Sequence, residues 1–175
     1  FQADPQPITG SMSIDPCIFI DDDGTTLLYY GGRWAGQLEL LRGQAMSEKT
    51  VLSKEAAEAL ALGPLVVPLD AGMRRFAQAP QQVTILDESG APLREGDTKR
   101  RFFEAAWVHK RFGTYFLSYS TGETHFIVYA TSTSPFGPFT YRGVLLAPVV
   151  GWTTHHSVVE FDHQWWLLHH DSTLS

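Results

Sequence analysis

Three polar residues lead the three copies of a pattern that recurs along the chain: Asp15, Glu104 and His155. In each copy the polar residue is followed by a short apolar run, a polar turn and a second apolar run rich in aromatic residues. The leading residue lies nine positions before Gly24, Gly113 and Gln164, respectively, and fifteen before the end of the second run in all three copies. Two carboxyl groups and an imidazole brought into one pocket would be equipped for proton transfer.

Each copy of the pattern predicts a β-hairpin, in which two short strands are joined by a tight turn. The turn residues are expected at Asp23-Gly24, Phe112-Gly113 and Asp162-His163. The leading residues are separated by 89 and 51 residues, and 51 is close to the roughly 40 to 50 residues of a four-stranded propeller blade. Because the innermost strands of propeller blades face a shared central channel, we expect an all-β fold in which the three leading residues meet.

Glycosidic bond cleavage is a reaction that such a pocket would suit. It requires two carboxyl groups in different environments, one protonated at neutral pH and one ionised. Sugars also bind to aromatic side chains, and the chain contains five Trp, six Tyr and eleven Phe residues. Taken singly, Asp15-Pro16 is typical of a turn that enters a strand, and Glu104 of a surface acid. The shared position in the repeat is what favours the functional interpretation.

Other motifs have simpler explanations. Asp21–Gly24 resembles part of a calcium loop but lacks the alternating acids and the distal Glu, which favours a hairpin turn. The pair His155-His156 has neither a His-Glu-x-x-His arrangement nor a cysteine partner, so zinc is not indicated. Trp107, Trp165 and Trp166, taken singly, are typical of residues in a core or a wall.

The long gap between the first two copies has a different composition. Glu and Ala are abundant from Met46 to Leu62, which predicts a short helix or helical turns ended by Gly63-Pro64, with Ser53 as a candidate cap. Residues 134–138 (SPFGP) predict a turn rather than a linker, because strand patterns flank them closely. Further strands are expected at residues 38–41, 65–68, 84–86, 125–130 and 144–146.

Length, composition and charge exclude several classes of protein. The 175 residues suit a single domain or a piece of a larger all-β domain, and 43% apolar residues are enough for a core. The formal net charge of -6 leaves no basic field for phosphates, so neither nucleic acid nor an anionic membrane is an expected partner. No apolar run is long enough to predict a membrane span. The single Cys17 excludes an internal disulfide.

Three segments together resemble successive blades of glycoside hydrolase family 43. They are residues 13–24 (SIDPCIFIDDDG), 102–122 (FFEAAWVHKRFGTYFLSYSTG) and 153–171 (TTHHSVVEFDHQWWLLHHD). Residues 129–139 resemble that family's connecting strand and turn as well. The likeness covers most of the chain from Ser13 onward, except for the region from about Leu41 to Arg100.

The resemblance implies a five-bladed β-propeller that hydrolyses β-xylosides or α-L-arabinofuranosides with inversion. The chain as given, residues 1–175, would supply roughly three blades, with the first and last blades outside the sequence. The implied ligand is a xylan or arabinoxylan oligosaccharide, with xylose or arabinose as the product. We expect an extracellular or periplasmic location rather than a cytoplasmic one.

The resemblance also assigns roles to individual residues. Glu104 matches the family's general acid, and Asp15 matches an acid that tunes pKa and orients the site. His155 matches a central histidine that helps to hold a calcium ion or a water molecule in the channel, although the reaction itself needs no cofactor. Trp107 and Phe103, on either side of the general acid, are expected to contact substrate or line the channel.

The family's general base has no match in this sequence. It should precede Asp15 by about one blade, roughly 40 residues or more, and only fourteen residues precede Asp15. Asp4-Pro5 imitates the base motif, but eleven residues cannot lead from the inner strand of one blade to that of the next. The sequence is therefore interpreted as an excerpt that is inactive alone, and a non-catalytic carbohydrate-binding propeller or a propeller that binds protein partners are the alternatives.

Overall fold

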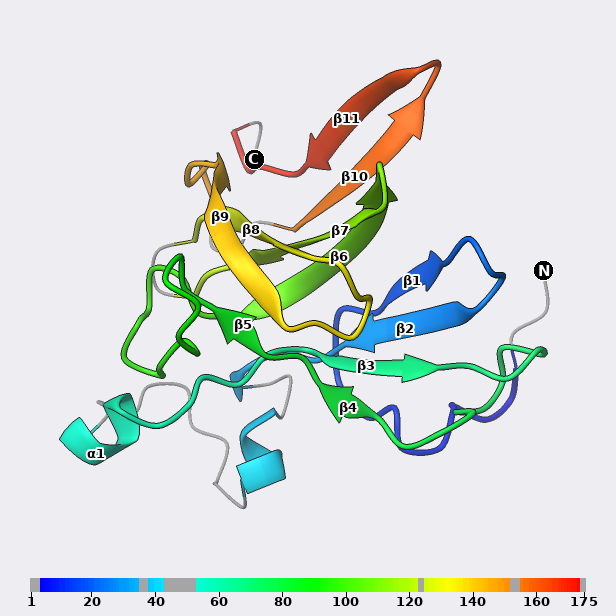
Figure 1. Cartoon of the computed structure of the whole chain (residues 1–175), viewed down its shortest axis with the longest axis horizontal. Helices are drawn as coiled ribbons and strands as arrows, with labels where there is room; N and C mark the ends of the chain where they lie inside the picture. The colour runs from blue at the N-terminus through cyan, green and yellow to red at the C-terminus, as the bar shows by residue number, and fades with distance from the viewer. Residues whose placement is uncertain (1–3, 35–37, 43–52, 123–124, 152–154, 174–175) are drawn as a thin grey trace.

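Antiparallel hairpins form the framework of the molecule, as the repeated pattern predicts. The computed structural model describes residues 4–34, 38–42, 53–122, 125–151 and 155–173. In this part of the chain the strands form three sheets that follow one another along the sequence (Figure 1). The first sheet contains, in spatial order, β1 (Cys17–Ile20), β2 (Thr26–Tyr30), β3 (Leu65–Pro68) and β4 (Gln81–Gln82).

The second and third sheets contain the other two predicted hairpins. The second sheet has the order β5 (Ile85–Leu86), β9 (Phe139–Leu146), β8 (Ile127–Ser132), β7 (Thr114–Ser120) and β6 (Glu104–Arg111). All its pairs are antiparallel except that of β5 with β9. The third sheet is the hairpin of β10 (His156–Phe161) and β11 (Gln164–His169), which extends from the body of the molecule in Figure 1.

The first strand of each hairpin lies next to the first strand of the following one, because β6 contacts both β1 and β10. Between β1 and β6, the Val108 amide donates to Cys17 Sγ at 3.5 Å. Between β6 and β10, the Trp107 indole Nε1 donates to the Val158 carbonyl at 2.9 Å. Three sheets with adjacent inner strands are successive blades of a β-propeller, which confirms the predicted all-β fold class.

The main core lies between the first and second sheets. Strands β2 and β7 are buried on both faces for most of their length, and β2 accordingly carries an unbroken apolar run from Leu27 to Tyr30. Large buried side chains include Tyr29, Tyr119, Phe102 and Phe139. The Tyr29 hydroxyl donates to the Pro135 carbonyl at 2.6 Å, which satisfies its polar end inside the core.

Two predictions for the first long gap were wrong in part. Residues 38–41 belong to a 3₁₀ helix (Leu38–Arg42) rather than a strand. Of the helix expected from Met46 to Leu62, residues 46–52 lie outside the described residues, and within residues 53–62 only Lys54–Ala57 (α1) is α-helical. Ser53 caps α1 as predicted, because its side chain accepts the Ala56 amide at 3.2 Å. The helix ends early because the Ala61 amide pairs instead with the Leu93 carbonyl at 2.9 Å.

The remaining strand predictions differ from the structure mainly at their ends. Residues 65–68 form β3 as predicted, and residues 134–138 lie in the turn before β9. The strand expected at 125–130 runs two residues later, as β8, and the one expected at 144–146 begins at Phe139. β9 is longer because it pairs with both β8 and β5, so its first residues also gain partners.

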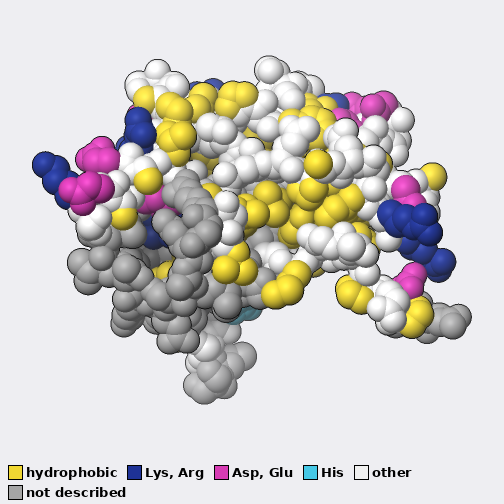
Figure 2. All heavy atoms as spheres, turned by 90° about the horizontal axis from the view of Figure 1, so that it is seen from below, with side chains coloured by type: hydrophobic (Ala, Val, Ile, Leu, Met, Phe, Trp, Pro, Cys, Tyr) yellow, Lys and Arg dark blue, Asp and Glu magenta, His cyan; other side chains and the backbone are white. Residues whose placement is uncertain are grey.

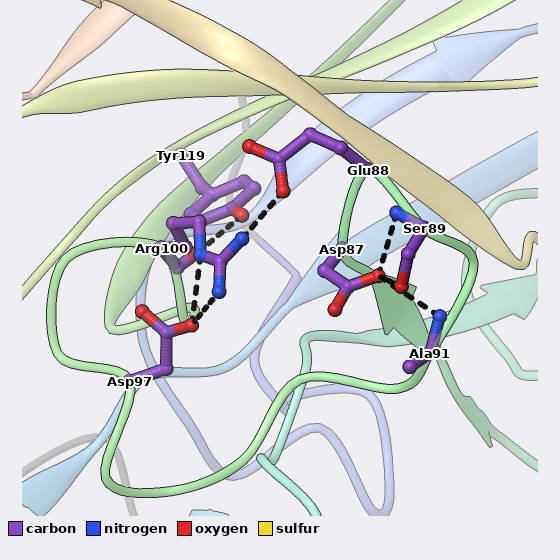
Figure 3. A network of polar contacts seen from close by, with 7 residues as sticks. All are labelled: Asp87, Glu88, Ser89, Ala91, Asp97, Arg100 and Tyr119. Atoms are coloured by element: carbon purple, nitrogen blue, oxygen red, sulfur yellow. Dashed lines mark hydrogen bonds and ion pairs between the residues drawn. The ribbon is translucent and has the colours of Figure 1, made fainter.

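A polar network fixes the connection between β5 and β6 (Figure 3). The Arg100 guanidinium donates to the Asp97 carboxylate at 2.8 Å through Nε and to the Glu88 carboxylate at 2.5 Å through Nη1. The Tyr119 hydroxyl of β7 donates to the Arg100 carbonyl at 2.5 Å. Asp87 accepts from the Ser89 and Ala91 amides and so closes the turn after β5. Asp97 and Tyr119 therefore hold the segment that leads directly into β6, whereas Glu88 binds Arg100 from the exposed surface.

Hydrophobic side chains gather in the middle of one face of the molecule, and charged side chains lie toward its two ends (Figure 2). The exposed large hydrophobic residues include members of the third sheet, with Phe161 72% and Trp166 48% exposed. Among the described residues, no helix is both long enough and apolar enough to cross a membrane.

Candidate active site

The structure brings Asp15, Glu104 and His155 together at the start of the three inner strands. Asp15 precedes β1, Glu104 is the first residue of β6, and His155 directly precedes β10. The Nε2 atom of His155 lies 3.5 Å from Oε1 of Glu104 and 3.8 Å from Oδ2 of Asp15. One ligand atom from each residue lies within 4.8 Å of the other two. Residues separated by 89 and 51 positions therefore form one cluster, as the repeat predicts.

The backbone beneath this cluster is locally irregular. Asp15 and Ala105 have φ angles of 54° and 58°, a region that residues other than glycine adopt only at some cost in energy. The pairing of β6 with β7 shifts register between Glu104 and Trp107, which is a β-bulge. Bulges of this kind change the direction of a side chain. The Asp15 carboxylate accepts the Ala105 amide at 3.2 Å, which ties the first acid to the bulge that carries the second.

Burial and neighbouring charges change the pKa values of Asp15 and His155. Burial raises the pKa of Asp15, and the negative charge of Glu104 adds to this, while the charge of His155 and the Ala105 amide oppose it. The polar contact with Glu104 raises the pKa of His155, and the charge of Asp15 adds to it, against the effect of burial. The positively charged imidazole is thus favoured between the two acids, and Glu104 itself is buried.

The spacing of the two acids decides what Asp15 can do. An inverting glycosidase separates its acid and base by roughly 6.5 to 9.5 Å so that a water molecule fits between base and sugar. The cluster places oxygen atoms of Asp15 and Glu104 within 4.8 Å of each other. Asp15 is therefore too close to serve as the base for Glu104 in such a mechanism. Asp4 pairs instead with Arg74 at 3.2 Å, with both side chains largely open to solvent.

The cluster does not by itself fit calcium. Calcium takes six to eight oxygen ligands, whereas the three side chains offer two carboxyl groups and one ring nitrogen. That nitrogen also faces the two carboxylates directly, at 3.5 and 3.8 Å. An ion here would need most of its ligands from water or from other parts of the protein, so we derive no chemical step through a metal.

The two aromatic residues beside Glu104 have structural partners. The Trp107 indole donates to Val158 of the next blade, and its ring packs against the main core. Phe103 is only 5% exposed and meets the Trp34 ring edge-to-face, with 4.9 Å between ring centroids. These contacts give both rings a structural role beside Glu104. The expected contact of Trp107 and Phe103 with substrate stays a prediction.

The segment after β2, residues 31–34 (GGRW), belongs to the surroundings of the site but was missed in the sequence. The Gly31 amide donates to the Ile14 carbonyl at 2.9 Å, next to Asp15. A Cβ atom on Gly32 would lie 2.7 Å from Ile14 Cδ1 and 3.3 Å from Glu104 Cβ. The glycine pair directly after a strand is the signal that could have indicated this close approach.

Comparison with known proteins places this chain in one family. Residues 2–174 match the family described as Glycosyl hydrolases family 43. A xylosidase/arabinosidase of Bacteroides ovatus is 51% identical over 171 residues, which are 98% of this chain and 52% of that protein. A β-xylosidase/α-arabinofuranosidase from a compost microbial metagenome, solved with xylotriose in a calcium-free form, superposes with a TM-score of 0.90 at 51% identity, over 98% of this chain and 52% of that one.

A third relative, a family 43 enzyme of Xanthomonas citri solved with xylose, gives a TM-score of 0.88 at 56% identity over 97% of this chain and 50% of that one. The fold is thus that of the β-propellers of this glycoside hydrolase family. The chain belongs to glycosyl hydrolase family 43. It spans about half the length of the relatives that it matches.

Proposed function

We propose that the full-length protein carrying this chain is an inverting glycoside hydrolase that releases xylose or arabinose from xylan-type polysaccharides or oligosaccharides. The observation that carries the proposal is the convergence of Asp15, Glu104 and His155 from three blades. The relatives support the substrate class, because one is called a xylosidase/arabinosidase and two were solved with xylose or xylotriose.

In this proposal Glu104 is the general acid, which delivers its proton to the oxygen of the leaving group. Its position at the first residue of a bulged inner strand holds the carboxyl group in a fixed and buried place. Asp15 stays beside it as the second carboxyl group that tunes the proton affinity of the site, since it is too close to act as the base. The base itself is expected in a blade outside this sequence.

His155 has a supporting role in the same proposal. Its imidazole lies between the two acids and, when protonated, offsets their negative charges. The positive charge of the imidazole thereby offsets the repulsion between the two carboxylates, so they can lie close together. A calcium ion bound beside His155 would need further ligands in addition to Asp15, Glu104 and His155.

The proposal is tested by replacing the general acid in the full-length protein. Glu104→Gln keeps the shape of the side chain but removes the proton, so hydrolysis of xylo-oligosaccharides should fall about 10² to 10⁴-fold. A dinitrophenyl xyloside, whose leaving group needs no proton, should lose much less. Glu88→Gln, which removes an exposed partner of Arg100, is the matched control and should leave both rates unchanged.

Two results would contradict the proposal. Absence of hydrolysis by the wild-type protein on any xyloside or arabinofuranoside, with sugar binding retained, would indicate a non-catalytic binding propeller. Equal losses on both substrates in Glu104→Gln would show that Glu104 is not the general acid. A screen with chromogenic xylosides and arabinofuranosides determines which of the two sugars is released.

A further inference from the structure

We propose that Glu95 is a positioning residue for the general acid and acts through two buried arginines, Arg33 and Arg101. The inference rests on the proposed function, since it concerns the placement of Glu104. All three charged residues are almost fully buried, with exposed fractions of 3% for Glu95, 7% for Arg33 and 4% for Arg101. They lie outside the cluster of Asp15, Glu104 and His155.

The Glu95 carboxylate connects three separate segments of the chain. Its Oε2 atom pairs with Nη1 of Arg33, which follows β2. Its Oε1 atom accepts the Leu62 amide at 3.0 Å. Nε of Arg101 lies 3.9 Å from Oε2 and donates to the Glu95 carbonyl at 2.8 Å. One buried acid thus contacts an arginine of the segment after β2, Arg33, and an arginine of the segment before β6, Arg101.

Both arginines hold the backbone directly in front of Glu104. The Arg33 amide donates to the Phe103 carbonyl at 2.9 Å. Nη1 of Arg101 donates to the Phe102 carbonyl at 3.4 Å. On the other side, the Phe103 amide donates to the Ser120 carbonyl of β7 at 3.0 Å. The two residues preceding the proposed general acid are therefore held by three hydrogen bonds.

The same contacts relate Glu104 to the other acid. Arg33 continues from Gly31 and Gly32, and the Gly31 amide holds the Ile14 carbonyl next to Asp15. Residues 31–33 thus lie between the backbones that carry Asp15 and Glu104. A buried ion pair adds little net stability compared with apolar packing, because burial of the charges costs desolvation energy. Its fixed geometry is the property that a catalytic site can use.

The experiment compares a poor and a good leaving group in the full-length protein. Glu95→Gln removes the charge that holds both arginines but retains an amide oxygen for the Leu62 amide. If Glu95 and the two arginines position Glu104, Glu95→Gln should lower kcat/KM for a methoxyphenyl xyloside at least about 10-fold more than kcat/KM for a dinitrophenyl xyloside. A variant that is merely less folded loses both rates in the same proportion, so the ratio separates positioning from stability.

Arg33→Lys provides a second and milder variant if Glu95→Gln yields no soluble protein. It keeps the charge but not the planar fork, so its ratio should move in the same direction by a smaller amount. Glu88→Gln, which alters an ion pair of the same connection at the surface, should leave the ratio unchanged. The inference would be overturned if Glu95→Gln and Arg33→Lys each lowered the rates on both substrates equally, provided that Glu104→Gln still showed the leaving-group effect. A wild-type protein inactive on both substrates would instead refute the proposed function.

Discussion

At the scale of single residues, the site combines strained backbone with close packing. Asp15 and Ala105 have positive φ angles, and the Asp15 carboxylate is bound to the Ala105 amide. Such conformations persist only where the surrounding structure holds them in place, and they are frequent in active sites. Here the surrounding structure includes Gly32, whose missing side chain leaves room for Ile14 and Glu104.

Gly32→Ala should therefore disturb both stability and activity. The added methyl group would lie 2.7 Å from Ile14 Cδ1 and 3.3 Å from Glu104 Cβ, so one of them must move. Overpacking of this kind typically costs about 1 to 3 kcal/mol of the free energy of unfolding. We expect that loss in denaturant unfolding of the full-length protein, together with a lower kcat. Gly72→Ala, where the nearest atom lies at 3.8 Å, is the control, and equal effects in both variants would contradict the prediction.

At the scale of elements, contacts between blades set the positions of the inner strands. Lys110 of β6 binds the Asp21 and Asp22 carboxylates of the first hairpin turn, each at 2.8 Å. The Tyr115 hydroxyl donates to the same Asp21 carboxylate at 2.5 Å. Together with the Trp107 contact to β10, these bonds fix β6 relative to both neighbouring blades. Convergence of the three leading residues depends on that alignment.

One half-buried histidine at the interface of the second and third blades, His109, should make this alignment sensitive to acid. His109 stacks on Phe116, with 5.0 Å between ring centroids, and meets Trp165 of β11. Its Nδ1 atom is buried without a hydrogen-bond partner among the described residues. Burial lowers the pKa of His109 to about 4, and the nearby Arg111 charge adds to this effect. On the facing strand β10, His156 also has a pKa lowered to about 4 by burial.

Because the unfolded chain binds a proton to His109 near pH 6.5 and the folded chain only near pH 4, stability should fall as pH decreases through this window. His109→Phe removes both the titration and the unpaired nitrogen. We expect it to raise the free energy of unfolding by on the order of 1 kcal/mol at neutral pH. The difference from wild type should widen between pH 6.5 and 4.

Denaturant unfolding at several pH values measures that difference. The exposed Gln164 at the start of β11 carries no titratable group, so Gln164→Ala provides a control that should show no such widening. A constant difference between His109→Phe and wild type over this pH range would contradict the prediction.

At the scale of the whole molecule, the chain would supply one side of the proposed catalytic site. It covers 52% of the Bacteroides ovatus relative and 52% of the compost enzyme. Asp15 is too close to Glu104 to be its base, and Asp4 is paired with Arg74 at the surface. The third sheet also exposes large apolar residues such as Phe161 and Trp166. Among the described residues, neither Asp15 nor Asp4 therefore meets the requirements for the base of the proposed inverting reaction.

Expressed alone, residues 1–175 should show no glycosidase turnover, whereas the full-length protein should be active. The reason is the missing general base, whose loss removes activation of the attacking water. The measurement is release of sugar from both an aryl glycoside and a xylo-oligosaccharide at equal protein concentration. Turnover by the isolated chain near the rate of the full-length protein would mean that Asp4 or another acid in this sequence acts as the base.

The sequence by itself determined the hairpins and the members of the central cluster. The alternation of apolar runs and turn residues predicts β1–β2, β6–β7 and β10–β11, since these signals are local. The equal spacing of Asp15, Glu104 and His155 predicts that they occupy equivalent positions, because a repeat places equivalent residues in equivalent places. By contrast, the abundance of Glu and Ala overpredicted the helix around α1, where pairing with Leu93 prevails over intrinsic preference.

Only the tertiary structure decided the distances and partners within the site. It shows that Asp15 lies too close to Glu104 to be an inverting base and that the Trp107 indole is bound to the next blade. It also brings Glu95 to Arg33 across 62 residues, in a region with no repeat to mark it. Such contacts depend on how blades pack against one another in three dimensions, and the local pattern of a single sequence carries no record of that packing.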